Sequence, residues 1–360
     1  MMGIYVHIPF CDSKCAYCAF ASFVVSNQIK REYFDHLQAE IATSHENDKV
    51  DSIYFGGGTP SSVDSEFIVS TLKLIKEKFD VTKDAEITIE CNPCSTTKQK
   101  LEAYKKAGFN RISFGVQSLD DDALSLIGRR HTSAQAMQAI ALAREVGFEN
   151  ISADLLLSLP QGDVTSDAQK LIESGVKHIS AYMIQIEDGT PLKRKVESGE
   201  IKLKDEDQTV DDYQKLTSFL QKNGLNRYEI SNFAYSGSES RHNSHYWTGE
   251  KYLGFGLGVH SFDGKFIRQA NACNFADYYA GKKTCESLSP KERDEEIIML
   301  GLRCKYGFDL KKLSFDLASQ PEFNKLLKQN VLNLQGTKVT LNPDFYPVSN
   351  SVIINLTKNF

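Results

Sequence analysis

Residues 11–18 read Cys-Asp-Ser-Lys-Cys-Ala-Tyr-Cys, and the rest of the chain can be interpreted outward from this stretch. Its three cysteines, Cys11, Cys15 and Cys18, follow the spacing C-x3-C-x2-C. Three thiolates on one short loop can bind a single metal centre, but a structural zinc site or an ordinary iron–sulfur cluster uses four protein ligands. Therefore either a fourth ligand comes from elsewhere in the chain, or one metal position is open to a small molecule.

The composition is typical of a globular protein of the cytoplasm. Hydrophobic residues make up 41% and charged residues 25% of the 360 residues, and the formal net charge is −5. This balance lacks the basic excess of a nucleic-acid-binding protein, and no apolar run approaches the roughly 20 residues of a membrane span. The first residues also lack the basic start and cleavage site of a signal peptide. We therefore expect a cytoplasmic protein whose eight cysteines are metal ligands or free thiols.

Short apolar segments alternate with amphipathic segments through the first half of the chain. The pattern predicts strands at residues 3–8, 52–55, 86–90, 111–114, 151–156 and 178–186, and helices at 32–42, 67–79, 98–107, 134–146 and 168–174. This order predicts an α/β fold with a parallel sheet. Because no dinucleotide-binding glycine motif follows the first strand, a partial TIM-type (β/α)6 barrel is favoured over an open flavodoxin-like sheet.

The pattern changes after residue 190. A helix at 205–222 and a short strand at 228–233 are followed by a polar, glycine-bearing stretch. From residue 290 on, we predict helices at 293–302, 310–317 and 323–329 and strands within 331–341 and at 351–356. The chain is thus expected to consist of a partial barrel at 1–200, a barrel-closing segment at 201–288 and a small α+β, winged-helix-like domain at 289–360.

Polar residues and glycines follow several predicted strands at the same end. The cysteines follow the first strand, residues 56–60 (Gly-Gly-Gly-Thr-Pro) follow the second, Glu90 ends the third, Gln117 follows the fourth and Asp154 lies in the fifth. The carboxyl ends of parallel strands meet at one rim, where TIM-type barrels carry their chemistry. Together these residues predict a cofactor-binding mouth. Taken singly, a strand-end carboxylate is more often a helix cap or a solvated group.

The C-x3-C-x2-C motif, with Tyr17 before its last cysteine, resembles the radical S-adenosylmethionine (SAM) enzymes. The resemblance implies that Cys11, Cys15 and Cys18 bind a [4Fe–4S] cluster whose fourth iron is chelated by SAM, which would explain the missing ligand. In that family the reduced cluster gives one electron to the sulfonium of SAM and a 5′-deoxyadenosyl radical results. A reductant for the cluster is therefore an implied partner.

A narrower resemblance is to the oxygen-independent coproporphyrinogen III oxidase group. It rests on Tyr5, on Arg129 and on residues 57–60 (Gly-Gly-Thr-Pro), 89–93 (Ile-Glu-Cys-Asn-Pro), 115–118 (Gly-Val-Gln-Ser) and 153–155 (Ala-Asp-Leu). The resemblance implies that SAM is bound by Tyr5, Tyr17, Gly57, Gly58, Thr59, Glu90, Gln117, Arg129 and Asp154. The alternative interpretation of Arg129 is a helix-end surface charge beside Arg130.

Residues 228–234 (Tyr-Glu-Ile-Ser-Asn-Phe-Ala) and 241–247 (Arg-His-Asn-Ser-His-Tyr-Trp) are similar to the HemW heme chaperones, whose pattern is H-N-x-x-Y-W. The resemblance implies that heme is bound by His242, Asn243, Tyr246 and Trp247, with His242 as the iron ligand and His245 as a second ligand or a bystander. A neutral imidazole is a good axial ligand, and aromatic rings suit a porphyrin face. The spacing alone favours a structural His–aromatic cluster that closes the barrel mouth.

Two features separate the chain from the oxidases themselves. Phe20 stands where the oxidases carry a further cysteine, and only four residues precede Tyr5, where the oxidases have a long extension. We therefore expect a heme chaperone that binds heme and a SAM-coordinated cluster and transfers heme to an acceptor protein. The alternatives are an oxidase of porphyrin biosynthesis and another radical SAM enzyme with a large substrate. The sequence does not decide whether the chain is an enzyme or forms a homodimer.

The remaining cysteines carry weaker patterns. Cys91 and Cys94 form a C-x2-C pair without a second pair nearby, so we interpret them as incidental thiols. The same interpretation applies to Cys273, Cys285 and Cys304. At the turn after the fifth strand, Ser158 departs from the Gly-Leu-Pro form of the related proteins.

Overall fold

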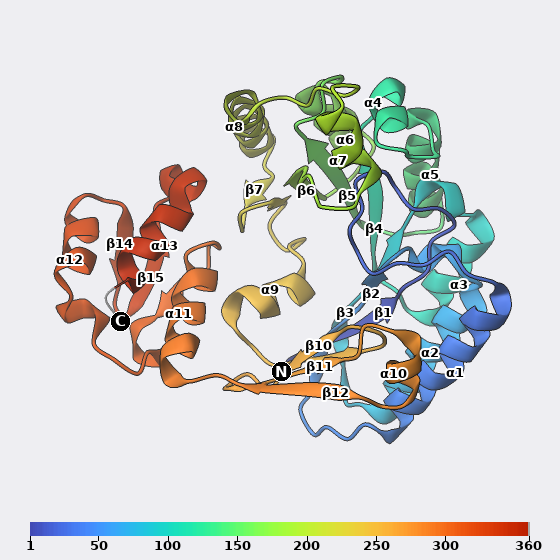
Figure 1. The fold of residues 1–360 in the computed structure, drawn as a ribbon, viewed down its shortest axis with the longest axis horizontal. Coiled ribbons are helices and arrows are strands. Elements are labelled where there is room, and N and C mark those ends of the chain that lie inside the picture. Colours follow the sequence, from blue (N-terminus) through green and yellow to red (C-terminus); the bar gives the residue numbers. More distant parts are fainter. Residues whose placement is uncertain (359–360) are drawn as a thin grey trace.

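The structure, a computed structural model, describes residues 1–358 and shows an open barrel with a smaller C-terminal part beside it (Figure 1). A twelve-stranded sheet has the order β12-β11-β10-β9-β1-β2-β3-β4-β5-β6-β8-β7. Strands β1 to β6 run parallel, and β9 also pairs parallel with β1. Antiparallel strands extend the sheet beyond β9 and beyond β6. The edge strands β12 and β7 do not pair with each other. The predicted partial barrel is thus confirmed.

The six parallel strands agree with the predicted segments. They are β1 (Met2–Ile8), β2 (Val50–Gly57), β3 (Val81–Cys91), β4 (Arg111–Gln117), β5 (Asn150–Leu157) and β6 (His178–Met183). The helices that accompany them are α1 (Asn27–Thr43), α2 (Ser65–Lys78), α3 (Lys98–Ala107), α4 (Asp121–Leu126), α5 (Ser133–Glu145), α6 (Val164–Glu173), α7 (Pro191–Glu197) and α8 (Glu206–Lys222). The short helices α4 and α7 were not predicted, because each is too short for a helical pattern to show.

Side chains of the parallel strands alternate between two environments. The outward set is apolar and packs under the helices: Ile4, Val6, Ile8, Ile53, Phe55, Ile87, Ile89, Ile112, Phe114, Ile151, Ala153, Leu155, Ile179 and Ala181. The opposite, inward set is polar: Tyr5, His7, Ser52, Tyr54, Glu86, Thr88, Glu90, Arg111, Ser113, Ser152, Asp154, His178 and Ser180. Successive residues of a strand face opposite sides. The barrel therefore encloses a polar lumen, whereas TIM-type barrels usually fill theirs with branched apolar side chains.

The segment after α8 adds elements to both edges of the barrel. β7 (Asn226–Arg227) and β8 (Asn232–Ala234) form a hairpin on β6, so the single strand predicted at 228–233 is wrong in its bounds. α9 (Arg241–Thr248) then lies beside β1 and β2 (Figure 1). β9 (Tyr252–Phe255), β10 (His260–Phe262), β11 (Ile267–Asn271) and β12 (Lys283–Ser287) extend the sheet beyond β1, with α10 (Phe275–Tyr279) between the last two.

The C-terminal part has its own hydrophobic core. α11 (Pro290–Gly301), α12 (Pro321–Lys328) and α13 (Ser349–Thr357) pack with a three-stranded antiparallel sheet of order β13-β15-β14. Its strands are β13 (Phe308–Asp309), β14 (Leu332–Gln335) and β15 (Lys338–Leu341). The domain boundaries at 200 and 288 stay predictions. Within residues 1–358, no helix has both the length and the apolar character that crossing a membrane requires.

Two secondary-structure predictions for this part are wrong. Residues 351–356, predicted as a strand from their β-branched run, belong to α13, because Val352, Ile353 and Leu356 fall on one helical face that is buried in the C-terminal core. Residues 310–317, predicted as a helix, instead contain the 3-10 turn Leu310–Lys312 and the start of another, Leu317–Ser319. The side chains of Asp309 and Asp316 each accept a backbone N–H at these turns and so interrupt a longer helix.

The turn after β5 yields a first prediction. Ser158 has φ 73°, a left-handed conformation that suits glycine, and its Oγ accepts a hydrogen bond from the Thr209 hydroxyl at 3.2 Å. Ser158→Val should lower the free energy of unfolding by about 2 kcal/mol, because a β-branched residue is strained there. Ser158→Gly should change it by less than about 1 kcal/mol, since relief of strain offsets the lost hydrogen bond. Urea unfolding distinguishes the two; equal destabilisation would contradict the argument.

Candidate functional site

The cysteine loop between β1 and α1 is held by hydrogen bonds from three places. The Cys11 N–H donates to the carbonyl of Phe23 at 3.1 Å. The Ala16 N–H donates to the carbonyl of Ile127, after α4, and the Ala16 carbonyl accepts from the Leu192 N–H in α7 at 2.9 Å. The two short helices that the sequence did not reveal therefore position the middle of the cysteine loop.

The three thiols are partly exposed. Cys11 Sγ is 3.4 Å from Thr59 Oγ1, and Cys15 Sγ accepts from Arg129 Nη1 at 3.4 Å. Burial raises the pKa of Cys11, and the nearby thiols of Cys18 and Cys15 add to this rise. No three His, Cys, Asp or Glu side chains within residues 1–358 form a ready metal-binding group. The cluster on these cysteines stays a prediction.

Arg129 provides the test of whether an anionic group fits beside the loop. It points inward, unlike the exposed Arg130, and its Nη2 donates to the Gly115 carbonyl. Although burial alone would lower it, the pKa of Arg129 is held above its ordinary value by Tyr17 and Cys15. Its Nε–H is buried without a hydrogen-bond partner, which is costly unless a ligand supplies one. Three thiols beside an unsatisfied guanidinium fit a thiolate-bound cluster with an anionic ligand.

The glycines after β2 are explained by packing. A Cβ at Gly57, which has φ 114°, would lie 2.5 Å from the His7 ring, and one at Gly58 would lie 2.7 Å from the Phe10 carbonyl oxygen. A side chain at Gly57 would displace the His7 ring, and one at Gly58 would displace the backbone at Phe10. The run therefore brings the end of β2 against β1 and sets Thr59 next to the cysteine loop. The contact of Gly57 and Gly58 with SAM stays a prediction.

Two carboxylates of the predicted SAM site lie inside the lumen. Glu90 accepts from the Tyr54 hydroxyl at 2.7 Å and from the Gly57 N–H at 3.1 Å. Burial raises the pKa of Glu90 to about 7 and that of Asp154 to about 6, the latter opposed by the Ser180 hydroxyl. A ligand that donates hydrogen bonds to these carboxylates would favour their charged forms. Ribose hydroxyls are such donors.

The other predicted SAM residues lie around the same mouth. Tyr5 is on the inner face of β1, with its hydroxyl 3.2 Å from His7 Nδ1. Tyr17 packs on a small apolar cluster that includes Ile127. Gln117 ends β4 with φ 71°, a conformation that costs free energy for a residue other than glycine and is often found at functional sites.

Helix α9 carries the His-Asn motif and is anchored on the inner face of β3. The carboxylate of Glu86 accepts the N–H groups of Arg241 and His242, each at 3.1 Å. The Ser240 side chain caps the same end of the helix. A carboxylate at a helix N-terminus is favourable because it faces unpaired N–H groups and the positive end of the helix dipole. Sequence analysis missed this helix, since its polar residues show no apolar stripe.

His242 is enclosed by aromatic side chains. It is 1% exposed, its Nδ1 lies 3.1 Å from Ser52 Oγ, and its Nε2 lies 2.9 Å from the Tyr246 hydroxyl. Its ring stacks on Tyr54 with the centroids 5.2 Å apart. Burial lowers the pKa of His242 to about 3, so the imidazole is neutral. The motif thus forms a buried His–aromatic cluster, as its spacing favoured, but the cluster lies near the amino ends of β1 and β2 and does not close the mouth that carries the cysteines. Heme ligation by His242 stays a prediction.

The other motif residues differ in their surroundings. Tyr246 packs edge-on against Tyr252 with centroids 4.7 Å apart. The Asn243 N–H donates to the Ser240 hydroxyl at 3.3 Å, and the Asn243 side chain is half-buried, as is Trp247. The structure therefore brings His242 and Tyr246 into contact and leaves Asn243 and Trp247 nearer the surface of α9.

His245 fixes α9 to β2 through charge. Its Nε2 is 2.7 Å from Asp51 Oδ1, and its Nδ1 is 2.6 Å from Glu250 Oε2. Although burial alone would lower it, these carboxylates raise the pKa of His245 to about 9. Both nitrogens are occupied, so His245 acts here as an anchor.

Two lumen residues escaped the sequence analysis. Tyr54 connects Glu90 to His242, as described above. Arg111 on β4 is 2% exposed, and its Nε has no hydrogen-bond partner; burial alone would lower its pKa, but Glu86, Tyr54, Tyr228 and Asp154 hold it above its ordinary value. For Tyr54 the available signal was its position between the apolar Ile53 and Phe55 in a strand segment. Arg111 follows the polar Asn110 at the start of β4, so the alternation gave no such signal for it.

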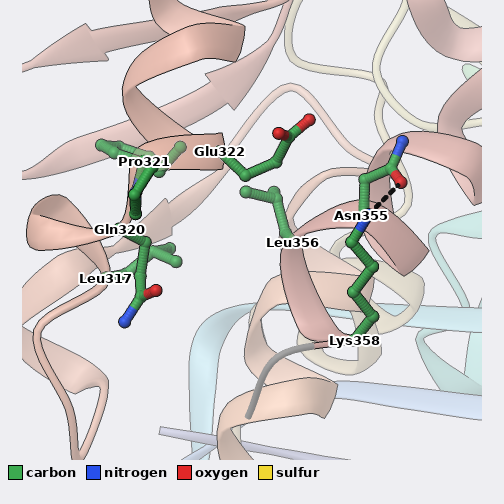
Figure 2. Close-up of a pocket in the computed structure, with 8 residues that line it drawn as sticks. Leu317, Gln320, Pro321, Glu322, Asn355, Leu356 and Lys358 are labelled. Carbon is green, nitrogen blue, oxygen red and sulfur yellow. Dashed lines mark hydrogen bonds between the residues drawn. The ribbon is translucent and has the colours of Figure 1, made fainter.

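A separate pocket lies in the C-terminal part, between α12 and α13 (Figure 2). It has a volume of about 190 Å³ and is lined by Leu317, Gln320, Pro321, Glu322, Phe323, Asn355, Leu356 and Lys358. None of the predicted site residues lines it. The candidate functional site is therefore in the barrel.

Comparison with known proteins agrees with the geometry. Residues 5–164 match the radical SAM superfamily, and residues 288–344 match the HemN C-terminal domain. The chain is 35% identical over 346 residues to the heme chaperone HemW of Lactococcus lactis, an alignment that covers 94% of this chain and 90% of the relative. The chain belongs to the HemW family. HemW of Bacillus subtilis is 34% identical over 329 residues, covering 87% of this chain and 86% of the relative.

Other relatives extend the comparison beyond bacterial HemW. The mitochondrial radical S-adenosyl methionine domain-containing protein 1 of Mus musculus is 31% identical over 386 residues, covering 98% of this chain and 87% of the relative. Among solved structures, the coproporphyrinogen III oxidase HemN of Escherichia coli superposes with a TM-score of 0.83 at 22% identity, covering 100% of this chain and 90% of that one. The HemN likeness shows that this HemW-family chain has the HemN fold.

The His245 anchor predicts a pH dependence of stability. The folded pKa of about 9 exceeds the ordinary value of 6.5, so the contribution of His245 is full below pH 6.5 and is lost as the pH rises through 9. His245→Gln should lower the free energy of unfolding by on the order of 2 kcal/mol at pH 6 and by much less at pH 10. Urea unfolding measures both, with His45→Gln on an exposed loop as the control. A loss independent of pH would refute the assignment.

Proposed function

We propose that this protein is a heme chaperone that binds heme together with a SAM-coordinated [4Fe–4S] cluster and delivers the heme to an acceptor protein. The observation that carries the proposal is the 35% identity to a heme chaperone HemW over nearly the whole of both chains. The barrel also offers, at one mouth, three thiols, a buried unsatisfied guanidinium and two enclosed carboxylates. These features support a cofactor site at the carboxyl ends of the strands, within the segment that matches the radical SAM superfamily.

The residues at the barrel mouth would each bind a different part of the cofactors. Cys11, Cys15 and Cys18 would hold the cluster, which supplies one-electron chemistry when SAM is bound to it. Arg129 would pair with a carboxylate, because its Nε–H lacks a partner. Glu90 and Asp154 would accept hydrogen bonds from ribose hydroxyls. The proposal places the protein in the cytoplasm, where a reductant is available and thiols persist.

Heme binding by His242 would require a change in α9. Both ring nitrogens have partners, Ser52 and Tyr246, so one of these contacts must be given up before iron can bind. The neutral state of the imidazole favours ligation, because no proton has to leave. Asn243 and Trp247 lie nearer the surface and would contact the porphyrin first. The aromatic cluster is in this view the heme-free state of the motif.

The cluster proposal predicts a cysteine-specific loss of iron. After anaerobic reconstitution, Cys15→Ser should lose almost all bound iron and sulfide, since the remaining thiolates cannot complete the cluster. Cys94→Ser is the matched control, because this exposed thiol lies outside the loop. Iron and sulfide analysis with visible absorbance measures the outcome. Equal retention of iron by both variants would refute the assignment of the cluster.

The heme proposal predicts a histidine-specific loss of affinity. His242→Ala should weaken heme binding at least roughly tenfold, because the axial bond is lost. His260→Ala, at an exposed position, should bind heme as the unaltered protein does. A titration followed by the Soret band gives both affinities, and thermal unfolding checks that each variant is folded. Heme binding that survives His242→Ala would place the ligand elsewhere.

An enzyme assay separates the chaperone from the oxidase. The reconstituted protein, supplied with SAM, a reductant and coproporphyrinogen III, should form no protoporphyrinogen, while heme preloaded on it should pass to an apo-acceptor protein. Product formation in this assay would replace the chaperone proposal with an oxidative decarboxylase.

A further inference from the structure

One side chain joins the predicted SAM site to the His-Asn motif. The Tyr54 hydroxyl donates to Glu90 Oε1 at 2.7 Å, and the Tyr54 ring stacks on His242 at 5.2 Å between centroids, with an interplanar angle of 25°. The Tyr5 ring lies against both, 6.1 Å from each centroid. A cofactor residue and a heme-motif residue that are 152 positions apart in the chain (242 − 90) thus contact the same tyrosine.

The Tyr54 side chain is closely packed where it contacts Glu90 and where it contacts His242. A Cβ at Gly56 would lie 2.8 Å from the Tyr54 ring and 3.0 Å from the Glu90 carboxylate. A Cβ at Gly3 would lie 2.9 Å from His242 Nδ1. Two glycines therefore make room for the contact, Gly56 on the same strand as Tyr54 and Gly3 on the neighbouring β1. In so close-packed a region, a shift of one side chain displaces its neighbours instead of being absorbed by a void.

The hydroxyl of Tyr54 is the part of the contact that a ligand can compete with. It donates to a carboxylate that, under the proposed function, accepts hydrogen bonds from SAM. The Glu90 carboxylate already accepts two hydrogen bonds, from Tyr54 and Gly57, in a buried setting. Each carboxylate oxygen can accept two hydrogen bonds, so a ligand donor can join Tyr54 at Oε1; it then shares the charge of that oxygen and weakens the bond from Tyr54. The ring of Tyr54 is then held less firmly over His242.

We propose that Tyr54 is a positioning residue that couples occupancy of the SAM site to the availability of His242 for heme. With Glu90 free of ligand, Tyr54 is held between Glu90 and His242, and α9 stays in the enclosed arrangement. With SAM on Glu90, the hydrogen bond from Tyr54 to Glu90 is weakened, and His242 can exchange one of its protein partners for iron. The inference rests on the proposed function, and it assigns to SAM a role in heme loading that needs no turnover of SAM.

The test compares heme affinity with and without SAM. The cluster-reconstituted, full-length protein is titrated with heme in the absence and presence of saturating SAM, and SAM binding is measured separately by equilibrium dialysis. SAM should tighten heme binding by about fivefold or more, within the usual range of coupling between two sites. In Tyr54→Phe, which keeps the ring and loses the hydroxyl, the ratio of the two heme affinities should fall toward one.

Two variants serve as controls for the hydroxyl and for the histidine contact. Tyr104→Phe removes a buried hydroxyl that has no hydrogen-bond partner, on α3 in the hydrophobic core that packs outside the sheet, and should keep the full SAM effect. Ser52→Ala removes the partner of His242 Nδ1 without touching Glu90. Ser52→Ala should change heme affinity by the same factor with and without SAM. The ratio of these two affinities should therefore equal that of the unaltered protein.

A second readout does not depend on heme. Hydrogen exchange of the amides in α9, followed by mass spectrometry, should speed up when SAM binds the unaltered protein and should be insensitive to SAM in Tyr54→Phe. Failure of the unaltered protein to bind heme or SAM would refute the proposed function. Binding of both ligands with no SAM effect on heme affinity or on α9, or an effect that persists in Tyr54→Phe, would overturn the coupling alone.

Discussion

A polar lumen inside a barrel of parallel strands is the constraint on which this structure depends. Removing charges such as Glu86, Glu90 and Arg111 from water is costly unless hydrogen bonds or opposite charges compensate. The chain compensates differently along the lumen. Near the amino ends of the strands, α9 fills the space and its N–H groups satisfy Glu86. Near the carboxyl ends, Glu90 can accept further hydrogen bonds, and the Nε–H of Arg129 has no acceptor. A ligand would satisfy these groups.

The alternation that builds this lumen is present in the sequence. Residues 86–90, Glu-Ile-Thr-Ile-Glu, show polar and apolar residues in strict alternation, and the strands and most helices follow from such patterns. The cysteine spacing likewise predicted the loop, and Gly108 predicted the end of α3, where it adopts φ 102°. Each of these features depends on residues that are close together in the sequence, and it can therefore be predicted from the sequence.

Features that depend on tertiary contacts could not be predicted. Residues 351–356 have strand propensity, but burial of one helical face in the C-terminal core decides their structure. Helix α9 forms because Glu86, distant in sequence, caps it, and Tyr54 gives no sign in its own strand that it touches His242. The H-N-x-x-Y-W pattern favoured a His–aromatic cluster, but the partners of His242, Ser52 and Tyr54, could not be inferred from it, because the pattern records residue types alone.

The attachment of α9 to Glu86 has a consequence for how the chain reaches its folded state. The contact joins residues 156 positions apart, and it exists only after β2 and β3 have been placed side by side. Contacts of such long sequence separation form late, because the loop between them must first be closed. The His-Asn motif therefore gains its structure only after β1, β2 and β3 have been placed side by side. A newly made chain does not present an ordered motif before that stage.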